Sequence, residues 1–247
     1  MTFLALLLVA AAAPLPAQMA MRGTASTGRL LFHSTATGTN GLACVHCHAD
    51  FDEQRQNDGL IRAGHPLFNA AARQTFWGQD PEDPDRYSDA AQAAVVCVEI
   101  FMLNPEKLSA QQALDLQAYL KEVVRRPTTS PLALAPAMDR TGAYAGYDGG
   151  DRIAGRRLFH ATCHTCHPNG NAGIAPVPIP RGKPPAYYAR QVREGNGLGS
   201  VLAGIDVNAY DPEGGKFMPF FGADRLTRQQ LRDIIAFVRS LPPAASR

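Results

Sequence analysis

The stretches Cys44-Val45-His46-Cys47-His48 and Cys163-His164-Thr165-Cys166-His167 decide how this 247-residue chain folds. Each places two cysteines three positions apart, with a histidine directly after the second cysteine. The two motifs lie 119 residues apart, counted from Cys44 to Cys163. They use four of the five cysteines, and only Cys97 lies outside them. A framework built from disulfides alone would leave one cysteine unpaired.

The sequence around the two motifs is also repeated. Gly28-Arg29-Leu30-Leu31-Phe32 recurs as Gly155-Arg156-Arg157-Leu158-Phe159, and each precedes a motif. Each motif is followed by an irregular stretch and then by apolar residues at helical spacing, over 108–120 and 226–238. Ser109 and Thr227 suit the N-caps of these last helices. The pattern therefore predicts a duplicated, helical unit.

The chemistry of the motif points to covalently attached haem. Two thiols one short turn apart can bond the two vinyl groups of a porphyrin, and the adjacent histidine can bind its iron. The sequence thus predicts two covalently bound haem c groups, held by the six residues Cys44, Cys47, His48, Cys163, Cys166 and His167. The alternative is a zinc site built from both cysteine pairs, and it would disrupt the repeat.

On these residues each half resembles a class I cytochrome c. The resemblance rests on a first helix with a glycine and an aromatic residue, the haem motif, and a last helix with an aromatic residue, as in Gly28/Phe32 with Tyr119 and Gly155/Phe159 with Phe237. It covers nearly all of the predicted mature chain. It implies an all-α fold of two tandem domains with long irregular loops. It also implies that the first and last helices cross at the glycine.

The resemblance further implies a sixth iron ligand in the second unit. Met218, in Lys216-Phe217-Met218-Pro219-Phe220, precedes the last helix as the ligand methionine does in class I cytochromes. A thioether is soft and uncharged, and it raises the reduction potential. The family also leads us to expect that Pro176, or a neighbouring proline, offers its carbonyl oxygen to the ring of His167.

Three candidates for the sixth ligand stay open in the first unit: Cys97, Met102 and His65. A thiolate would favour ferric iron, whereas methionine would favour ferrous iron. On an α-helix Cys97 and Met102 would point about 140° apart, so one helix would not present both to one iron. Cys97-Val98-Glu99-Ile100-Phe101-Met102 resembles the distal segment of thiosulfate dehydrogenases and of the dihaem subunit of the sulfur-oxidation system, where a cysteine binds iron.

The remaining sequence sets the organisation of the chain. Phe3 to Ala13 form an apolar run that predicts an export signal over 1–17, with an uncleaved anchor as the alternative. The predicted units span 22–125 and 148–247, and a proline-bearing linker spans 126–147. Residues 50–89 form a long insertion that contains Trp77 and the acidic stretch Asp80–Asp85. The net charge of +2 does not indicate nucleic-acid binding.

These features favour a periplasmic dihaem protein that carries electrons between other redox proteins, in the periplasm or in membrane electron-transfer complexes. No transmembrane segment is expected once the signal is cleaved. The second hypothesis is an enzyme that oxidises an inorganic sulfur compound such as thiosulfate, with Arg55, Arg62 and Arg73 available to bind the anion. A dihaem peroxidase and a tightly bound subunit of a larger respiratory or photosynthetic complex are further alternatives.

Overall fold

A computed structural model describes residues 21–73, 76, 87, 89–125, 135–202 and 218–243. The predicted export signal, Trp77, the acidic stretch Asp80–Asp85 and residues 126–134 of the predicted linker lie outside these ranges. The described part contains helices, turns and irregular loops but no β-strand, which confirms the all-α prediction. Within it, no helix combines the length and apolarity needed to cross a bilayer.

Residues 21–125 are called the first half below, and their described part contains seven short elements. The α-helices are α1 (Ala25–His33), α2 (Cys44–Cys47), α3 (Ala90–Val96) and α4 (Ala110–Glu122), the 3₁₀ turns are η1 (Thr35–Thr37) and η2 (Ala70–Ala72), and η3 (Cys97–Phe101) is a π-helix. The N-cap predicted at Ser109 is confirmed and is part of a capping box at α4, because Ser109 Oγ accepts from Gln112 N at 3.2 Å and Gln112 Oε1 accepts from Ser109 N at 2.9 Å.

Residues 135–243, called the second half, repeat this plan. The elements are α5 (Arg152–Thr162), η4 (Pro168–Gly170), α6 (Pro185–Glu194), α7 (Leu198–Leu202) and α8 (Arg228–Arg239). Thr227 and Gln230 form the same capping box at α8, at 3.2 and 2.8 Å. Residues 135–147, which belong to the predicted linker, pack against the second half. The carbonyl oxygen of Ala135 accepts a hydrogen bond from Ala223 N, and Tyr144 and Tyr147 are buried in the core of this half.

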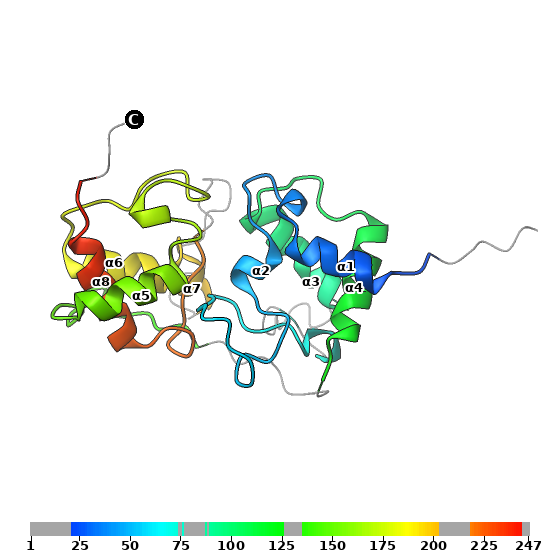
Figure 1. Ribbon diagram of the computed structural model, residues 1–247, viewed down its shortest axis with the longest axis horizontal. Coiled ribbons are helices and arrows are strands. Elements are labelled where there is room, and N and C mark those ends of the chain that lie inside the picture. The colour runs from blue at the N-terminus through cyan, green and yellow to red at the C-terminus, as the bar shows by residue number, and fades with distance from the viewer. Residues whose placement is uncertain are drawn as a thin grey trace, which may run out of the picture.

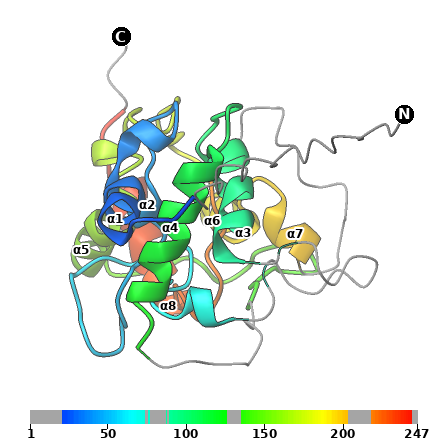
Figure 2. The ribbon, with the colours of Figure 1, turned by 90° about the vertical axis from the view of Figure 1, so that its right-hand side faces the viewer.

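The first and last helices of each half cross at a glycine, as predicted. A Cβ atom on Gly28 of α1 would overlap the carbonyl oxygen of Asp115 in α4, and one on Gly155 of α5 would overlap that of Asp233 in α8. Figure 2 shows α1 beside α4. Only glycine allows backbones to approach this closely. The predicted aromatic contacts follow, between Phe32 and Tyr119 and between Phe159 and Phe237.

At each helix crossing, a buried aspartate of the last helix accepts a hydrogen bond from the chain that leads into the first helix. Asp115 Oδ1 accepts from Thr24 N at 2.7 Å and from Gln111 Nε2 at 2.9 Å. Asp233 Oδ1 accepts from Asp151 N and Gln229 Nε2, both at 2.8 Å. The chain that enters the first helix is thus tied to the last helix in both halves, which makes the repeat structural as well as sequential.

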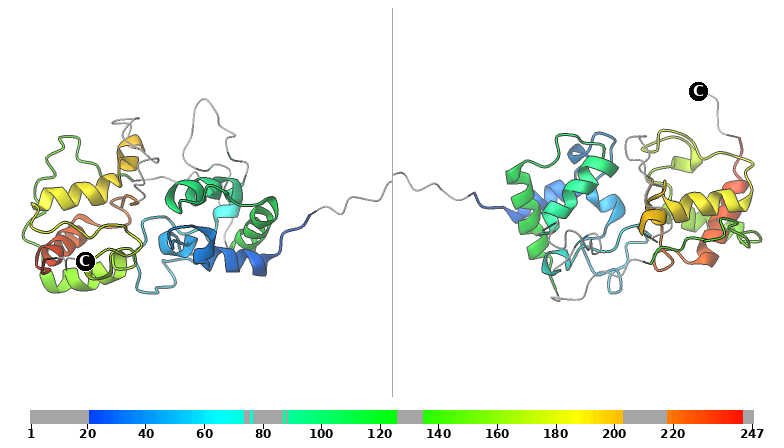
Figure 3. Two further views of the ribbon diagram at one scale, coloured as in Figure 1. Left: turned by 90° about the horizontal axis from the view of Figure 1, so that it is seen from above. Right: turned by 180° about the vertical axis from the view of Figure 1, so that it is seen from behind.

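The two halves lie side by side, with α1 to α4 in one group and α5 to α8 in the other (Figure 1). The segment around residues 50–65 runs between the groups in the views from above and behind (Figure 3). A small cluster of Leu42, Val98 and Met102 also packs against Cys166 and Ile174 of the second half. The first cysteine motif therefore lies on the side of its half that faces the second.

Candidate functional site

The first motif forms one helical turn, α2, which places Cys44 and Cys47 on adjacent positions of the turn. His48 follows directly, and its N–H donates to the carbonyl oxygen of Cys44 at 2.9 Å. Burial raises the pKa of the Cys44 thiol to about 11. Burial, with a contribution from the neighbouring Cys166 and Cys44, raises that of Cys47 to about 12. Both thiols are protonated at neutral pH and form no disulfide.

The imidazole of His48 is held in one orientation. Its Nδ1 lies 2.8 Å from the carbonyl oxygen of His65, and Gly64 N donates to the carbonyl oxygen of Cys47 at 2.9 Å. A side chain on Gly64 would overlap the His48 ring. Burial lowers the pKa of His48 to about 4, and the cationic Arg73 adds to the decrease. The ring is thus neutral, with its hydrogen assigned to Nδ1 and the Nε2 lone pair available for a metal.

Cys97 and Met102 lie on a π-helical turn, which changes the expected geometry. Met102 N donates to the carbonyl oxygen of Cys97 at 2.9 Å, a bond between residues five apart. The 140° separation expected for an α-helix therefore does not apply to this turn. π-turns are frequent at functional sites. Burial raises the pKa of the Cys97 thiol to about 12, and the nearby Cys44 and Cys47 add to the increase.

The other candidates of the first half have partners of their own. The ring Nε2 of His65 lies 2.6 Å from Asp224 Oδ2. Arg55 and Arg62 are paired with carboxylates of Asp52 and Asp58, respectively, so neither is a free cation for an anionic substrate. Arg73 is partly buried and donates to the carbonyl oxygen of Pro66 at 3.0 Å.

The second motif repeats the first in an irregular turn. His167 N donates to the carbonyl oxygen of Cys163 at 2.8 Å, as His48 N does to Cys44. Burial raises the pKa of Cys163 to about 12, and raises that of Cys166 as well. Burial also lowers the pKa of His167. Its Nδ1 is buried with no hydrogen-bond partner among the described residues, so the expected bond to Pro176 is not formed.

Met218 lies between α7 and α8, in the segment that leads into the last helix. Its carbonyl oxygen accepts from Asn196 Nδ2 at 3.4 Å, and the segment after it is tied to α6 because Phe221 N donates to Val192. Arg193 fixes the same segment, with Nη1 at 2.8 Å from the carbonyl oxygen of Phe221. Its side chain is 1% exposed, and its Nε has no partner among the described residues.

These observations fit a porphyrin with acidic substituents. Each motif supplies two neutral thiols beside a neutral imidazole, and no three His, Cys, Asp or Glu side chains of the described part cluster as a metal site by themselves. Within the described part of the chain, the guanidinium of Arg193 binds two backbone carbonyl oxygens and no carboxylate, and a buried charge without a counter-charge is costly. A haem propionate would supply that anion.

Comparison with known proteins identifies the class of the second half. Residues 153–242 match the family "Cytochrome c". This part of the chain, from α5 to just beyond α8, is a cytochrome c domain, which implies covalently bound haem c and electron transfer. No curated protein matches the chain.

Among solved structures, thiosulfate dehydrogenase (TsdBA) from Marichromatium purpuratum, in its as-isolated form, is similar at 22% identity with a TM-score of 0.24. The match covers 88% of this chain and 40% of that one, so the chain spans less than half of that protein's length. A superposition with this score establishes neither a common fold nor a common activity.

Sequence reasoning singled out the motif residues and Met218 but not Arg193, Glu53, Asp224 or Arg225. Arg193 carried a detectable signal, because it lies at an interior position of an amphipathic helix, where an arginine requires a specific partner. The other three are polar residues in loops and turns, and nothing in their spacing indicates that they meet.

Proposed function

We propose that this protein is an exported dihaem cytochrome c that transfers electrons between other redox proteins. The observation that carries the proposal is the equivalence of the halves. The first half repeats the cysteine–histidine turn, the glycine crossing and the buried aspartate of the half that matches the cytochrome c family. Bound haem supplies one-electron redox chemistry, and the chain positions it and adjusts its potential.

The chain's own residues would perform three tasks. Cys44 and Cys47, and in the second half Cys163 and Cys166, would hold haem covalently. His48 and His167 would present neutral nitrogens to iron. Arg193 would balance an anionic substituent. The two attachment turns approach each other, because Cys166 packs against the Leu42 cluster and its charge would influence Cys47. This proximity favours electron exchange between the two sites.

For the sixth ligands we propose Met218 in the second half and Cys97 in the first, with Met102 as the competitor of Cys97. Cys97 lies close enough to Cys44 and Cys47 for their charges to influence its pKa. Met102 is 3% exposed and packs with Leu42 and Val98. A thiolate and a thioether would give the two haems different potentials and the transfer a direction.

A ligand test uses single substitutions in the holoprotein. Cys97→Ala should change the low-spin EPR signal of one haem and leave the other unchanged. Met218→Ala should abolish the charge-transfer absorption band of a methionine-ligated ferric haem. Met102→Leu is the matched control for Cys97→Ala, since it keeps an apolar side chain of similar volume. A signal altered by Met102→Leu and not by Cys97→Ala would assign the ligand to Met102.

The function itself is tested by a redox titration of the purified protein, followed optically. Two one-electron steps at different potentials would support a dihaem carrier. A single step in a protein with one haem per chain would contradict it. The Cys47→Ser and Cys166→Ser variants should each lose one attachment bond without affecting the other haem, which assigns each step to a motif.

The second candidate function is oxidation of an inorganic sulfur compound such as thiosulfate at the first haem. The observation in its favour is the buried Cys97 beside the attachment cysteines. Steady turnover of thiosulfate with an artificial electron acceptor, lost in Cys97→Ala, would favour the enzyme. Reduction of the haems by thiosulfate without turnover would favour the carrier.

A further inference from the structure

The loop of residues 58–66 is bonded to the first attachment turn from several sides. Arg62 is 4% exposed, and its Nε donates to the carbonyl oxygen of Val45, inside the motif, at 2.8 Å. Its guanidinium is fixed in turn by Asp58 at 2.5 Å. Gly64 N binds the carbonyl oxygen of Cys47, and the carbonyl oxygen of His65 lies against His48 Nδ1. The loop therefore sets the orientation of His48.

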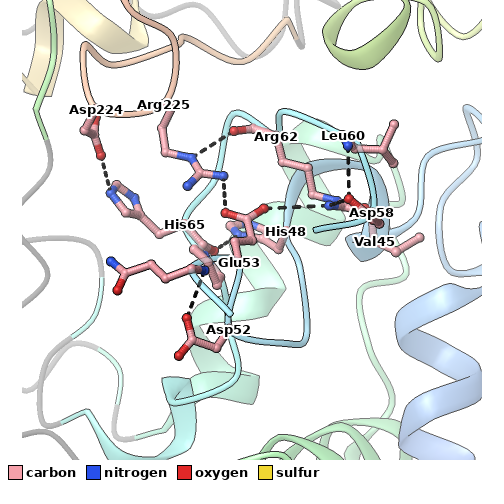
Figure 4. Close-up of polar contacts among 12 residues, drawn as sticks. Val45, His48, Asp52, Glu53, Asp58, Leu60, Arg62, His65, Asp224 and Arg225 are labelled. Carbon is pink, nitrogen blue, oxygen red and sulfur yellow. Dashed lines mark hydrogen bonds and ion pairs between the residues drawn. The ribbon is translucent and has the colours of Figure 1, made fainter. Parts of the chain in front are cut away.

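The second half holds this same loop through the turn before α8. Arg225 Nε donates to the carbonyl oxygen of Arg62 at 2.9 Å, and its Nη2 lies 2.6 Å from Glu53 Oε2. The neighbouring Asp224 lies 2.6 Å from His65 Nε2. Figure 4 shows Asp224 and Arg225 reaching His65, Arg62 and Glu53, which lie around His48. Two adjacent residues of the second half, Asp224 and Arg225, thus bind the loop at His65 and at Arg62.

These contacts are stronger than ordinary surface ion pairs. The Arg225 and Glu53 side chains are only 14% and 19% exposed, so water screens the pair incompletely. The planar guanidinium of Arg225 donates hydrogen bonds to a carbonyl oxygen and to a carboxylate at the same time, and a lysine ammonium could not do so with the same geometry. Ile61 N adds a backbone bond to the carbonyl oxygen of Ala161, two residues before Cys163. The loop that is bonded to the first attachment turn is thereby also bonded to the helix that leads into the second.

We propose that Asp224 and Arg225 are positioning residues for the iron ligand of the other half: acting through Arg62 and His65, they fix the His48 imidazole. The inference rests on the proposed function, because it requires iron at His48. Partners beyond the ligands themselves orient the imidazole and adjust its donor strength. The second half would therefore control the electronic state of the first haem as well as bind its own.

The test compares Arg225→Ala with Arg232→Ala in the holoprotein. Arg232 is the matched control, because its Nε also donates to a backbone carbonyl at 2.9 Å, that of Asp148 within the second half. Arg225→Ala should shift the potential and the low-spin EPR signal of the first haem and leave the second unchanged. It should also speed amide hydrogen exchange at Gly64, a readout independent of redox activity. Arg232→Ala should leave all three as in the parent.

A second pair of variants keeps the test decisive if Arg225→Ala folds poorly. Asp224→Ala removes the acceptor for His65, whereas Asp224→Asn retains an oxygen that can accept the same hydrogen. The alanine variant should alter the EPR signal of the first haem, and the asparagine variant should restore it. Equal shifts of both haems, or no change in either alanine variant, would overturn the positioning role. Haem content of the parent is measured first, since a parent without the first haem would refute the proposed function instead.

Discussion

The histidines of the two motifs, His48 and His167, lie in similar turns but have different hydrogen-bond partners. Nδ1 of His48 is bonded to the carbonyl oxygen of His65, whereas Nδ1 of His167 is buried with no partner among the described residues. The segment after each motif bonds the attachment turn, with Gly64 N donating to the carbonyl oxygen of Cys47 and Ala175 N to that of Cys166, but only the first segment also bonds the histidine ring. The helical frame has thus been kept in both halves, while the surroundings of the proposed iron ligands differ.

The largest expected effect tests whether the frame is shared. Gly28→Val and Gly155→Val should each destabilise the protein by about 3 kcal/mol or more, because a side chain there forces the crossing helices apart. Denaturant unfolding would measure the change. Leu30→Ala and Ile153→Ala are matched controls on the same helices, since both side chains are exposed. A large loss in only one half would show that the crossings are not equivalent.

A smaller effect is expected at the buried aspartates. Asp115→Ala and Asp233→Ala should each cost about 2 kcal/mol, because a backbone N–H and a glutamine amide lose their acceptor. The corresponding asparagine variants should recover part of this loss, since one oxygen remains. Similar unfolding free energies for the two alanine variants would support the comparison. A neutral result in either half would contradict the role assigned to that carboxylate.

The smallest expected effect concerns Tyr119, because the two halves differ at this helix position. Tyr119 donates to Asp50, which also contacts His33 at 2.9 Å, whereas Phe237 occupies the corresponding helix position and has no hydroxyl. Tyr119→Phe should cost about 1 kcal/mol at neutral pH. Phe237→Leu is the control in the second half, and it should leave the pH dependence described next unchanged.

Burial and the neighbouring Asp50 raise the pKa of Tyr119 above its ordinary value of 10.0. The native state therefore favours the protonated phenol, and its contribution to stability is complete below pH 10 and is lost as the pH rises further. Parent and Tyr119→Phe should consequently converge in stability above pH 10. A difference between them that stays constant up to that range and beyond would contradict the raised pKa.

Much of the frame was predictable. The N-caps at Ser109 and Thr227 and the absence of strands from the described part follow from local sequence patterns, and the glycine crossings follow from the resemblance to class I cytochromes c. The π-turn after Val96 was not predictable, because one hydrogen-bond shift within a helix leaves no clear trace in side-chain periodicity. The site was predicted at its cysteines and histidines, which carry a chemical signature.

The contacts between the halves could not be predicted. Glu53 and Arg225 are separated by 172 residues, and His65 and Asp224 by 159. Their meeting depends on how the halves pack, which no local rule determines. His65 illustrates the limit: sequence reasoning considered its ring as an iron ligand, whereas the structure uses its carbonyl oxygen for His48 and its ring for Asp224.

The central claim is that both cysteine motifs carry covalent haem, and mass spectrometry of the mature protein tests it most directly. The protein should be produced in a host whose haem-attachment machinery is active, then digested and analysed by peptide. The account predicts one haem on the peptide containing Cys44 and Cys47 and one on the peptide containing Cys163 and Cys166. Unmodified cysteines on either peptide would contradict it.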